Sequence, residues 1–127
     1  MGNLVEKKCT PCEGGAVPIN HDEAHRMLKE IPGWSLHEIA TSPAKGRKGH
    51  LQIEHEFKFK NFKEAMGFVN KIAELAENEG HHPDIFIHGW NKVLLTFYTH
   101  AIGGLSENDF IMAAKVNALA PPVLRTC

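Results

Sequence analysis

The fold is indicated most clearly by residues 51–80, which read LQIEHEFKFKNFKEAMGFVNKIAELAENEG. Apolar and polar residues nearly alternate over the first nine positions, with His55 in the apolar row, as is typical of a β-strand with one buried face. From Asn61 the apolar spacing becomes helical, and Gly80 ends the pattern. We therefore expect a strand over 51–59 and then a helix over 61–80. The apolar face of this helix carries Phe62, Ala65, Met66, Val69, Ile72, Ala73 and Ala76.

The residues before this stretch predict another helix and a partner strand. Asn20 with Glu23 three positions later is a capping-box pattern, and helical spacing of apolar residues continues up to Pro32-Gly33. Trp34 then begins a short strand, which residues 42–46 break into a turn. We expect a helix over about residues 20–31 and an antiparallel hairpin between the strand after Trp34 and the strand over 51–59.

The residues after this stretch predict a second hairpin and a last helix. Two β-rich runs, 85–88 and 92–100, flank the turn at 89–91. Ser106 with Asp109 three positions later is a further capping-box pattern, and Pro121-Pro122 would stop the helix that follows it. That helix carries Phe110, Ile111, Ala114 and Ala118 at helical spacing.

The order of these elements is helix, two strands, helix, two strands, helix. Hairpins separated by single helices favour an antiparallel sheet over a parallel one. We predict an α+β fold in which three helices pack on one face of a four-stranded antiparallel sheet. The strand over 92–100 has apolar residues on both sides, so the second sheet face is either solvated or covered by another subunit. Homo-oligomerisation through the sheet or its edge is the economical explanation.

Composition indicates one small domain without bulk charge. The chain has 127 residues, 43% of them hydrophobic, and its 14 Lys and Arg nearly balance 15 Asp and Glu, which disfavours nucleic acid and membrane partners. No apolar run is long enough for a membrane span, and the first residues lack a secretory pattern, so we expect a cytoplasmic protein. Residues 1–19, with two Pro and three Gly, predict an irregular arm, and residues 20–127 a single domain.

Histidines at the predicted second hairpin are the densest group of candidate functional residues. His81 and His82 precede a proline, and because successive strand residues point to opposite sides, at least one should face solvent or a cleft. His100 ends the next strand, so pairing of the two strands would bring the three histidines together. Asp109, in the first turn of the last helix, and Glu77, in the last turn of the preceding helix, would then lie nearby.

Three imidazoles beside carboxylates favour proton transfer, because a neutral and a charged His can act as base and acid at one pH. Zinc also accepts three His and a water, although the H-E-x-x-H pattern is absent and the adjacent pair lacks the spacing of a helical site. A third interpretation makes the histidines surface residues, with Asp109 only a capping acid and Glu77 a solvated helix residue. Residue types alone leave these alternatives open.

Other chemically capable residues have weaker patterns. Cys9 and Cys12 form one isolated CxxC, and with Cys127 they give an odd number, so we expect reduced thiols without a catalytic role. Trp34 and Trp90 are expected to be packing or interface aromatics. The other six histidines are expected to be solvated or singly hydrogen-bonded: His21, His25, His37, His50, His55 and His88.

A series of short motifs follows one another through the second half of the chain. It comprises Glu77 with GHHPD at 80–84, WNKV at 90–93, Thr99-His100 and GLSENDF at 104–110. These motifs resemble the pterin-4a-carbinolamine dehydratases, also called 4a-hydroxytetrahydrobiopterin dehydratases. Gly33-Trp34 and the phenylalanines at 57, 59 and 62 also resemble that family, and the resemblance covers most of the chain from 20 to 118.

The resemblance implies a small α+β subunit that assembles into dimers and tetramers. Members of the family dehydrate the 4a-hydroxy adduct that aromatic amino acid hydroxylases leave on tetrahydropterin. The product is the quinonoid dihydropterin, and no metal or other cofactor is needed. The expected activity is therefore that of a hydro-lyase acting on a pterin.

The resemblance also implies roles for individual residues. His81 and His100 correspond to the acid and base, and His82 to a residue that orients the substrate. Asp109 would position a histidine. The expected substrate-binding residues are Glu77, Thr99 and Pro83.

Two features depart from the animal members of the family. Gly80 stands where these often have an acidic residue, and Ile87-His88-Gly89 is one residue longer, as in plant and bacterial forms. Animal members also bind a homeodomain transcription factor through a helical surface and stabilise its dimer. A protein-binding module of that kind is the alternative to the enzyme.

Overall fold

The computed structural model describes residues 4–10, 17–46 and 48–120. Its helices are α1 (His21–Leu28), α2 (Phe62–Glu79) and α3 (Glu107–Leu119). Its strands are β1 (Ser35–Ile39), β2 (His50–Lys58), β3 (Asp84–His88) and β4 (Lys92–Phe97). Short 3-10 turns occur at η1 (Leu4–Glu6), η2 (Pro43–Lys45) and η3 (His100–Ile102).

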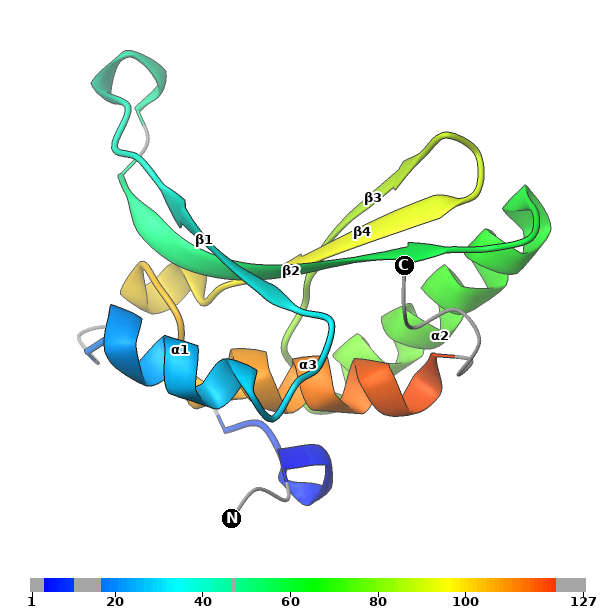
Figure 1. Cartoon of the computed structure of the whole chain (residues 1–127), viewed down its shortest axis with the longest axis horizontal. Coiled ribbons are helices and arrows are strands. Elements are labelled where there is room, and N and C mark those ends of the chain that lie inside the picture. Colours follow the sequence, from blue (N-terminus) through cyan, green and yellow to red (C-terminus); the bar gives the residue numbers. More distant parts are fainter. Residues whose placement is uncertain (1–3, 11–16, 47, 121–127) are drawn as a thin grey trace.

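The strands form one antiparallel sheet in the order β1-β2-β4-β3, with the three helices on one of its faces (Figure 1). The predicted α+β fold and the order of its elements are confirmed. Both predicted hairpins are present, and β2 and β4 pair in the middle of the sheet. The polypeptide therefore leaves β1 and β3 as sheet edges.

The helix-facing side of the sheet forms the core. Ile53 lies opposite Phe97, and Phe57 lies opposite Val93, and all four side chains are fully buried. Residues directly opposite in an antiparallel pair point to the same face, so the alternation seen in the sequence becomes one apolar layer. Phe97 matters for the site described below, because it belongs to this layer and lies near the end of β4.

Side-chain caps fix where the first two helices begin. Asn20 Oδ1 accepts a hydrogen bond from the Glu23 N–H at 2.8 Å, and Asn61 Oδ1 accepts one from the Glu64 N–H at 2.8 Å. Each bond satisfies an otherwise unpaired N–H of the first helical turn. The predicted helix starts are thus confirmed.

The ends of two predicted elements lie earlier than expected. After Leu28 the chain continues in a tighter turn, in which the Ile31 N–H donates to the Leu28 carbonyl, so α1 stops before residue 31. β4 ends at Phe97, after which Thr99 makes an isolated bridge with Gly104, and His100 lies in η3. His100 is therefore in a turn and not at the end of a strand.

The buried faces of two helices also differ from the predicted ones. On α2, Phe68 is buried, whereas Phe62 is 53% exposed and Ala73 is exposed. On α3, Ala118 is exposed, and the buried residues run almost continuously from the first turn: Asn108, Asp109, Phe110, Ile111, Met112, Ala113 and Val116. The reason is that α3 contacts η1 and α2 as well as lying under the sheet, so it is covered on several sides.

The N-terminal residues contribute to that cover. Residues 4–10, called here the docked arm, pack Leu4 into the core, and Val5 accepts a hydrogen bond from Lys115 Nζ of α3 at 2.8 Å. Apart from η1 the arm has no regular structure. The arm is irregular in backbone but is held against α3.

The open face of the sheet is mostly polar. Phe86 lies opposite Leu94 on this face and is 58% exposed, but carboxylates and histidines surround the pair, including a His88–Glu56 contact of 2.6 Å. The predicted apolar residues on both sides of β4 are thus present, with the open-face residues half-buried. Coverage of this face by another subunit stays a prediction.

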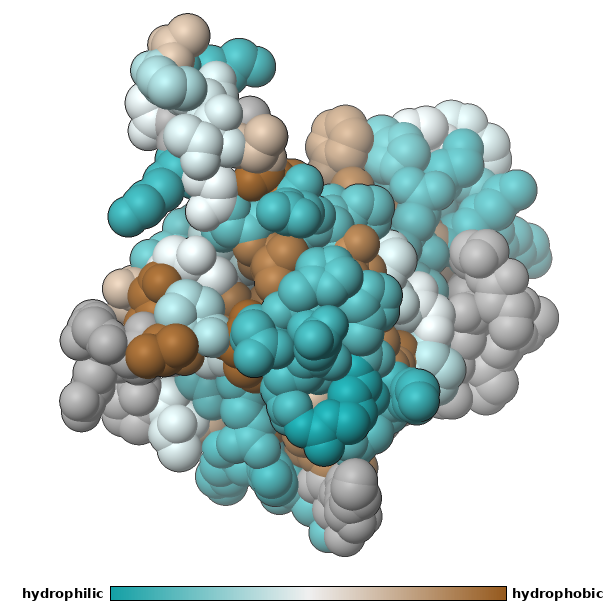
Figure 2. All heavy atoms as spheres, turned by 60° about the vertical axis from the view of Figure 1, so that its left-hand side comes forward, coloured by the Kyte–Doolittle hydropathy of each residue, from teal (hydrophilic) through white to brown (hydrophobic). Residues whose placement is uncertain are grey.

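The connection between β1 and β2 projects from the body of the molecule as a separate lobe (Figures 1 and 2). On the side drawn in Figure 2, apolar side chains appear as separate areas among hydrophilic ones. In the described part of the chain, no helix combines the length and the apolar character that crossing a membrane requires.

Candidate active site

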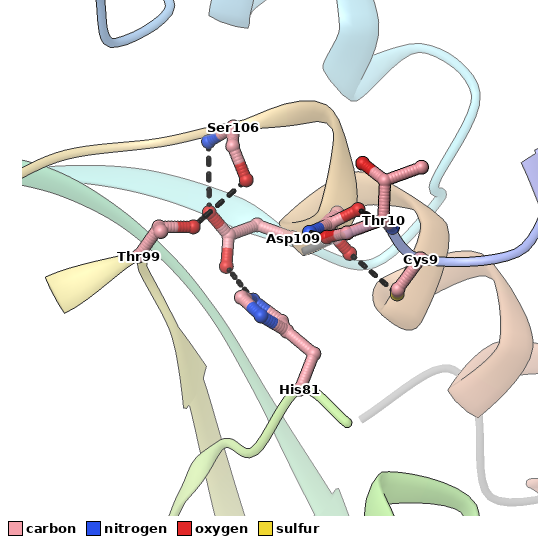
Figure 3. A network of polar contacts seen from close by, with 7 residues as sticks. Cys9, Thr10, His81, Thr99, Ser106 and Asp109 are labelled. Atoms are coloured by element: carbon pink, nitrogen blue, oxygen red, sulfur yellow. Dashed lines mark hydrogen bonds and ion pairs between the residues drawn. The ribbon is translucent and has the colours of Figure 1, made fainter. Parts of the chain in front are cut away.

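Asp109, in the first turn of α3, is fully buried and accepts hydrogen bonds on both carboxylate oxygens. Oδ1 accepts from His81 Nε2 at 2.6 Å. Oδ2 accepts from the Thr99 hydroxyl at 2.9 Å and from the Ser106 backbone N–H at 2.9 Å (Figure 3). The carboxylate thus joins the α2–β3 connection, the end of the last strand and the start of α3.

The Ser106 and Thr99 hydroxyls extend this network. Their oxygens lie 2.8 Å apart. Because the single Thr99 proton is directed at Asp109, the Ser106 hydroxyl is the donor in that contact. Asp109 and Ser106 form the predicted capping box of α3, so Asp109 is a helix cap and a histidine partner at once. Asp109 is therefore more than a capping acid, and Ser106 contributes a hydroxyl to the network as well as the cap.

The hydrogen bond to Asp109 determines which nitrogen of His81 carries a proton. A carboxylate oxygen only accepts, so Nε2 of the neutral ring carries the hydrogen and Nδ1 keeps its lone pair. The His81 side chain makes no other hydrogen bond within the described residues, and about a tenth of it is exposed. The ring is therefore held through Nε2 and has Nδ1 available to a ligand.

Backbone and ring contacts also hold His81 in place. Gly80 ends α2 with φ +69°, and the N–H groups of Gly80 and His81 both donate to the Ala76 carbonyl. The left-handed conformation needed at this position has a lower free-energy cost for glycine than for other residues, which accounts for Gly80. The His81 ring then lies nearly parallel to Phe97, 8° between planes and 6.1 Å between centroids. Phe97, a member of the core layer, thus covers one face of the His81 ring.

His82 is oriented by a different carboxylate. Its Nε2 lies 2.5 Å from Glu77 Oε2, and both side chains are mainly exposed. His81 and His82 therefore point to different environments, one buried and one solvated, as the alternation of extended residues requires. The expected proximity of Glu77 to the histidine pair is confirmed, and it concerns His82.

His100 and Pro83 lie beside this arrangement without joining its hydrogen bonds. The strand pairing of β3 and β4 ends at Asp84 and Thr96, and His100 follows in η3. His100 is exposed, and its ring lies 4.1 Å from that of Tyr98. No hydrogen bond within the described residues joins His100 to the other two histidines. Its part in the site stays a prediction, as do substrate contacts of Pro83 and Thr99.

His55 is the most deeply buried of the other six histidines. Its Nδ1–H donates to the Glu56 carbonyl at 3.0 Å, and its buried Nε2 has no hydrogen-bond partner. Burial lowers the pKa of His55, and the hydrogen bond to the Glu56 backbone opposes that shift. The ring stacks on Phe57 and meets the edge of Trp34, so it serves as part of the core.

The two tryptophans have different environments. Trp34 is buried, contacts the Phe97 ring, and donates from Nε1 to Asn117 Oδ1 at 3.0 Å, which confirms its packing role. Trp90 is 63% exposed in the β3–β4 turn and has φ +59°. It is therefore not a core residue.

Metal binding and thiol chemistry are the other two chemistries that the described residues could offer. Among those residues, no three His, Cys, Asp or Glu side chains are grouped so that they could hold a metal ion. Burial, with the nearby Glu79 carboxylate, raises the pKa of Cys9 to about 12. Cys12 and Cys127, which were also expected to be reduced thiols without a catalytic role, lie outside the described residues.

The model of the pterin 4 alpha carbinolamine dehydratase family matches residues 17–119. The chain belongs to this family. The match includes every residue of the Asp109 network and its neighbours at 77–83 and 100.

Bacterial relatives carry the name of the same family. A relative from Alkaliphilus metalliredigens, named as a pterin-4-alpha-carbinolamine dehydratase, is 50% identical to this chain over 117 residues. These residues are 92% of this chain and 96% of the relative. One from Methylococcus capsulatus is 48% identical over 93% of this chain and 94% of its own. Among solved structures, the transcriptional coactivator/pterin dehydratase of Brucella melitensis has 35% identity and a TM-score of 0.65, covering 82% of this chain and 99% of its own.

Proposed function

We propose that the protein is a hydro-lyase that dehydrates 4a-hydroxytetrahydropterin to quinonoid dihydropterin. The observation that carries the proposal is the His81–Asp109–Thr99 network, found in a chain that belongs to the pterin 4 alpha carbinolamine dehydratase family. A buried carboxylate fixes one nitrogen of His81 and leaves the other available for a substrate. This is the arrangement that general acid–base catalysis by histidine requires.

The reaction needs two proton transfers. An acid protonates the 4a-hydroxyl so that the C4a–O bond breaks and water leaves, and a base takes the proton from N5 as the N5=C4a double bond forms. We assign these two roles to His81 and His100 as a pair. In this proposal His81 acts through Nδ1, since Nε2 is engaged by Asp109.

Other residues of the proposed site bind and orient. The exposed His82–Glu77 pair offers an imidazole and a carboxylate, which can hydrogen-bond the polar edge of a pterin. Pro83 restricts the backbone of His82 to an extended conformation, which limits where that ring can point. Thr99 acts on the substrate indirectly in this proposal, because its hydroxyl is directed at Asp109.

The proposal extends to cofactors and partners. The proton transfers need no metal or organic cofactor, because the substrate supplies the 4a-hydroxyl and, from N5, a proton that balances the one added to form water. The enzyme would act after an aromatic amino acid hydroxylase, which forms the 4a-hydroxy adduct. We also propose a homo-oligomer, because Phe86 and Leu94 face outward beside the sheet edge formed by β3.

A second candidate function is binding to a transcription factor. The observation in its favour is the solved relative from Brucella melitensis, whose name joins a transcriptional coactivator to a pterin dehydratase. Such a module would stabilise the dimer of its partner through a helical surface. A pull-down with a helical dimerisation peptide tests it, and absence of capture alongside dehydratase turnover would favour the enzyme alone.

The decisive test is turnover of 4a-hydroxytetrahydropterin generated in place by an aromatic amino acid hydroxylase. Ultraviolet absorbance follows the reaction, and the uncatalysed rate without protein is subtracted. We expect turnover by the unmodified protein and a loss of about 10²-fold in kcat for His81→Gln. His88→Gln is the matched control, because it also removes an imidazole bound to a carboxylate, at Glu56 on the open sheet face. Lack of turnover by the folded, unmodified protein would refute the proposal.

A further inference from the structure

The docked arm is hydrogen-bonded to the residue that precedes Asp109. Asn108 Oδ1 accepts from the Thr10 backbone N–H at 3.0 Å, and Asn108 Nδ2 donates to the Thr10 carbonyl at 2.6 Å. Asn108 is buried, so its amide faces the arm and not water. Figure 3 shows Thr10 and Cys9 on one side of Asp109 and Thr99 on the other.

The same arm reaches the last turn of α2, which leads into His81. The Cys9 backbone N–H donates to Glu79 Oε1 at 3.0 Å, and Glu79 lies two residues before His81. Glu79 also forms an ion pair with Lys115 of α3 at 3.7 Å. Two successive residues of the arm thus hold the two segments that supply the His81–Asp109 hydrogen bond.

We propose that Cys9 and Thr10 of the docked arm position the His81–Asp109 pair, and that Asn108 is the positioning residue through which they act. His81 comes from the end of one helix and Asp109 from the start of another. The arm links these two ends through hydrogen bonds of Cys9 and Thr10, one to Glu79 and three to Asn108. Removing one link lets the first turn of α3 move relative to the end of α2.

Small movements of this kind affect chemistry more than binding. A displacement of about 1 Å in a catalytic group can lower a rate by about 10²-fold. Substrate binding in the proposed function draws on the exposed His82–Glu77 pair, which the arm does not contact through any hydrogen bond in the described residues. The inference therefore predicts a change in kcat with little change in KM, and in this kinetic form it rests on the proposed function.

The test uses two variants that break the same contact from opposite sides. Asn108→Ala removes the amide, whereas Thr10→Pro removes the N–H donor and leaves α3 unaltered. We expect each to lower kcat about tenfold with KM within about twofold, and the double variant to be no worse than either single one. Lys7→Ala is the control, because it removes only an exposed ion pair between the arm and Glu107.

A spectroscopic measurement tests the positioning without any turnover. The ¹⁵N chemical shifts of the His81 ring report its hydrogen bond to Asp109, and His81→Gln identifies the resonance. We expect both shifts to change in Asn108→Ala and in Thr10→Pro, and to stay unchanged in Lys7→Ala.

The outcomes separate this inference from the proposed function. Unchanged His81 shifts and unchanged kcat in both variants, even with a lower melting temperature, would overturn the inference and reduce the arm to a stabilising element. Changed shifts in a protein that turns over no pterin would support positioning while refuting the dehydratase.

Discussion

Gly33 lies directly against the imidazole of His55, so closely that a Cβ atom at position 33 would fall 2.4 Å from His55 Nε2. Gly33 also has φ +92°, a backbone conformation that residues other than glycine rarely adopt. The nitrogen that it covers is the buried Nε2 without a hydrogen-bond partner. The glycine thus closes the core over a histidine that is held neutral.

Gly33→Ala should destabilise the protein, because the new methyl group would overlap the His55 ring and the backbone would be strained. We expect a loss of about 2–4 kcal/mol in the free energy of unfolding, measured by urea denaturation. Gly46→Ala is the matched control, since Gly46 has φ +63° but open space around it, and should lose only about 1 kcal/mol. Equal losses in the two variants would show that the contact with His55 contributes nothing.

The low pKa of His55 predicts that stability falls in mildly acidic solution. Burial holds the folded-state pKa below the ordinary 6.5, so as the pH falls the unfolded chain takes up a proton before the folded protein does. The contribution of His55 is therefore complete above pH 6.5 and is lost as the pH falls through the folded-state pKa. Urea denaturation at a series of pH values should show this loss in the unmodified protein and less of it in His55→Phe. Equal pH dependence in the two proteins would contradict the prediction.

Thr99→Val should weaken the site while keeping the shape of the side chain. It removes the hydroxyl that donates to Asp109 and also the acceptor for Ser106, leaving buried polar groups unpaired. We expect a loss of about 1–3 kcal/mol in the free energy of unfolding and a fall of about tenfold in kcat. Thr99→Ser, which restores the hydroxyl, should recover most of both. Failure of Thr99→Ser to recover kcat would show that the methyl group, not the hydroxyl, is important.

The Cys9 thiol should be nearly inert in the folded protein. With a pKa of about 12, only about 10⁻⁴ of it is thiolate at pH 8. In the double variant Cys12→Ser, Cys127→Ser, iodoacetamide should modify Cys9 far more slowly than it modifies the urea-unfolded chain, as followed by mass spectrometry. Equal rates in the two states would contradict the prediction.

The fold could be predicted from the sequence because its helices and strands carry local sequence signals. Asn20 and Asn61 stand at helix starts, and the alternation from Ile53 to Phe57 survives as the core layer. The buried faces of the helices were harder to predict, because Phe68 is covered by the rings of Phe57 and Phe59, and α3 by η1 and α2, which are distant from it in sequence. Periodicity records that a face is apolar but not how many neighbours surround the helix.

The site was predicted in part for the same reason. The His81-His82 pair and its carboxylates could be found from residue type and spacing, and the two hydrogen bonds of the pair run to Asp109 and Glu77. Residue type and spacing alone left the role of Asp109 open, because a capping acid and a histidine partner look alike in a sequence, and only the family resemblance predicted that Asp109 positions a histidine. The hydrogen bond from Thr10 to Asn108 spans 98 positions and that from Cys9 to Glu79 spans 70, so neither leaves a local pattern.

The capping role of Asp109 ties the assembly of the site to the fraying of a helix. Opening of the first turn of α3 withdraws the carboxylate from His81 in the same event, so an intact site cannot coexist with a frayed helix start. Amide hydrogen exchange at Ser106 and Asp109 would therefore report how often the site comes apart in solution. The free energy of that local opening sets an upper limit on the fraction of molecules in which the histidine is oriented.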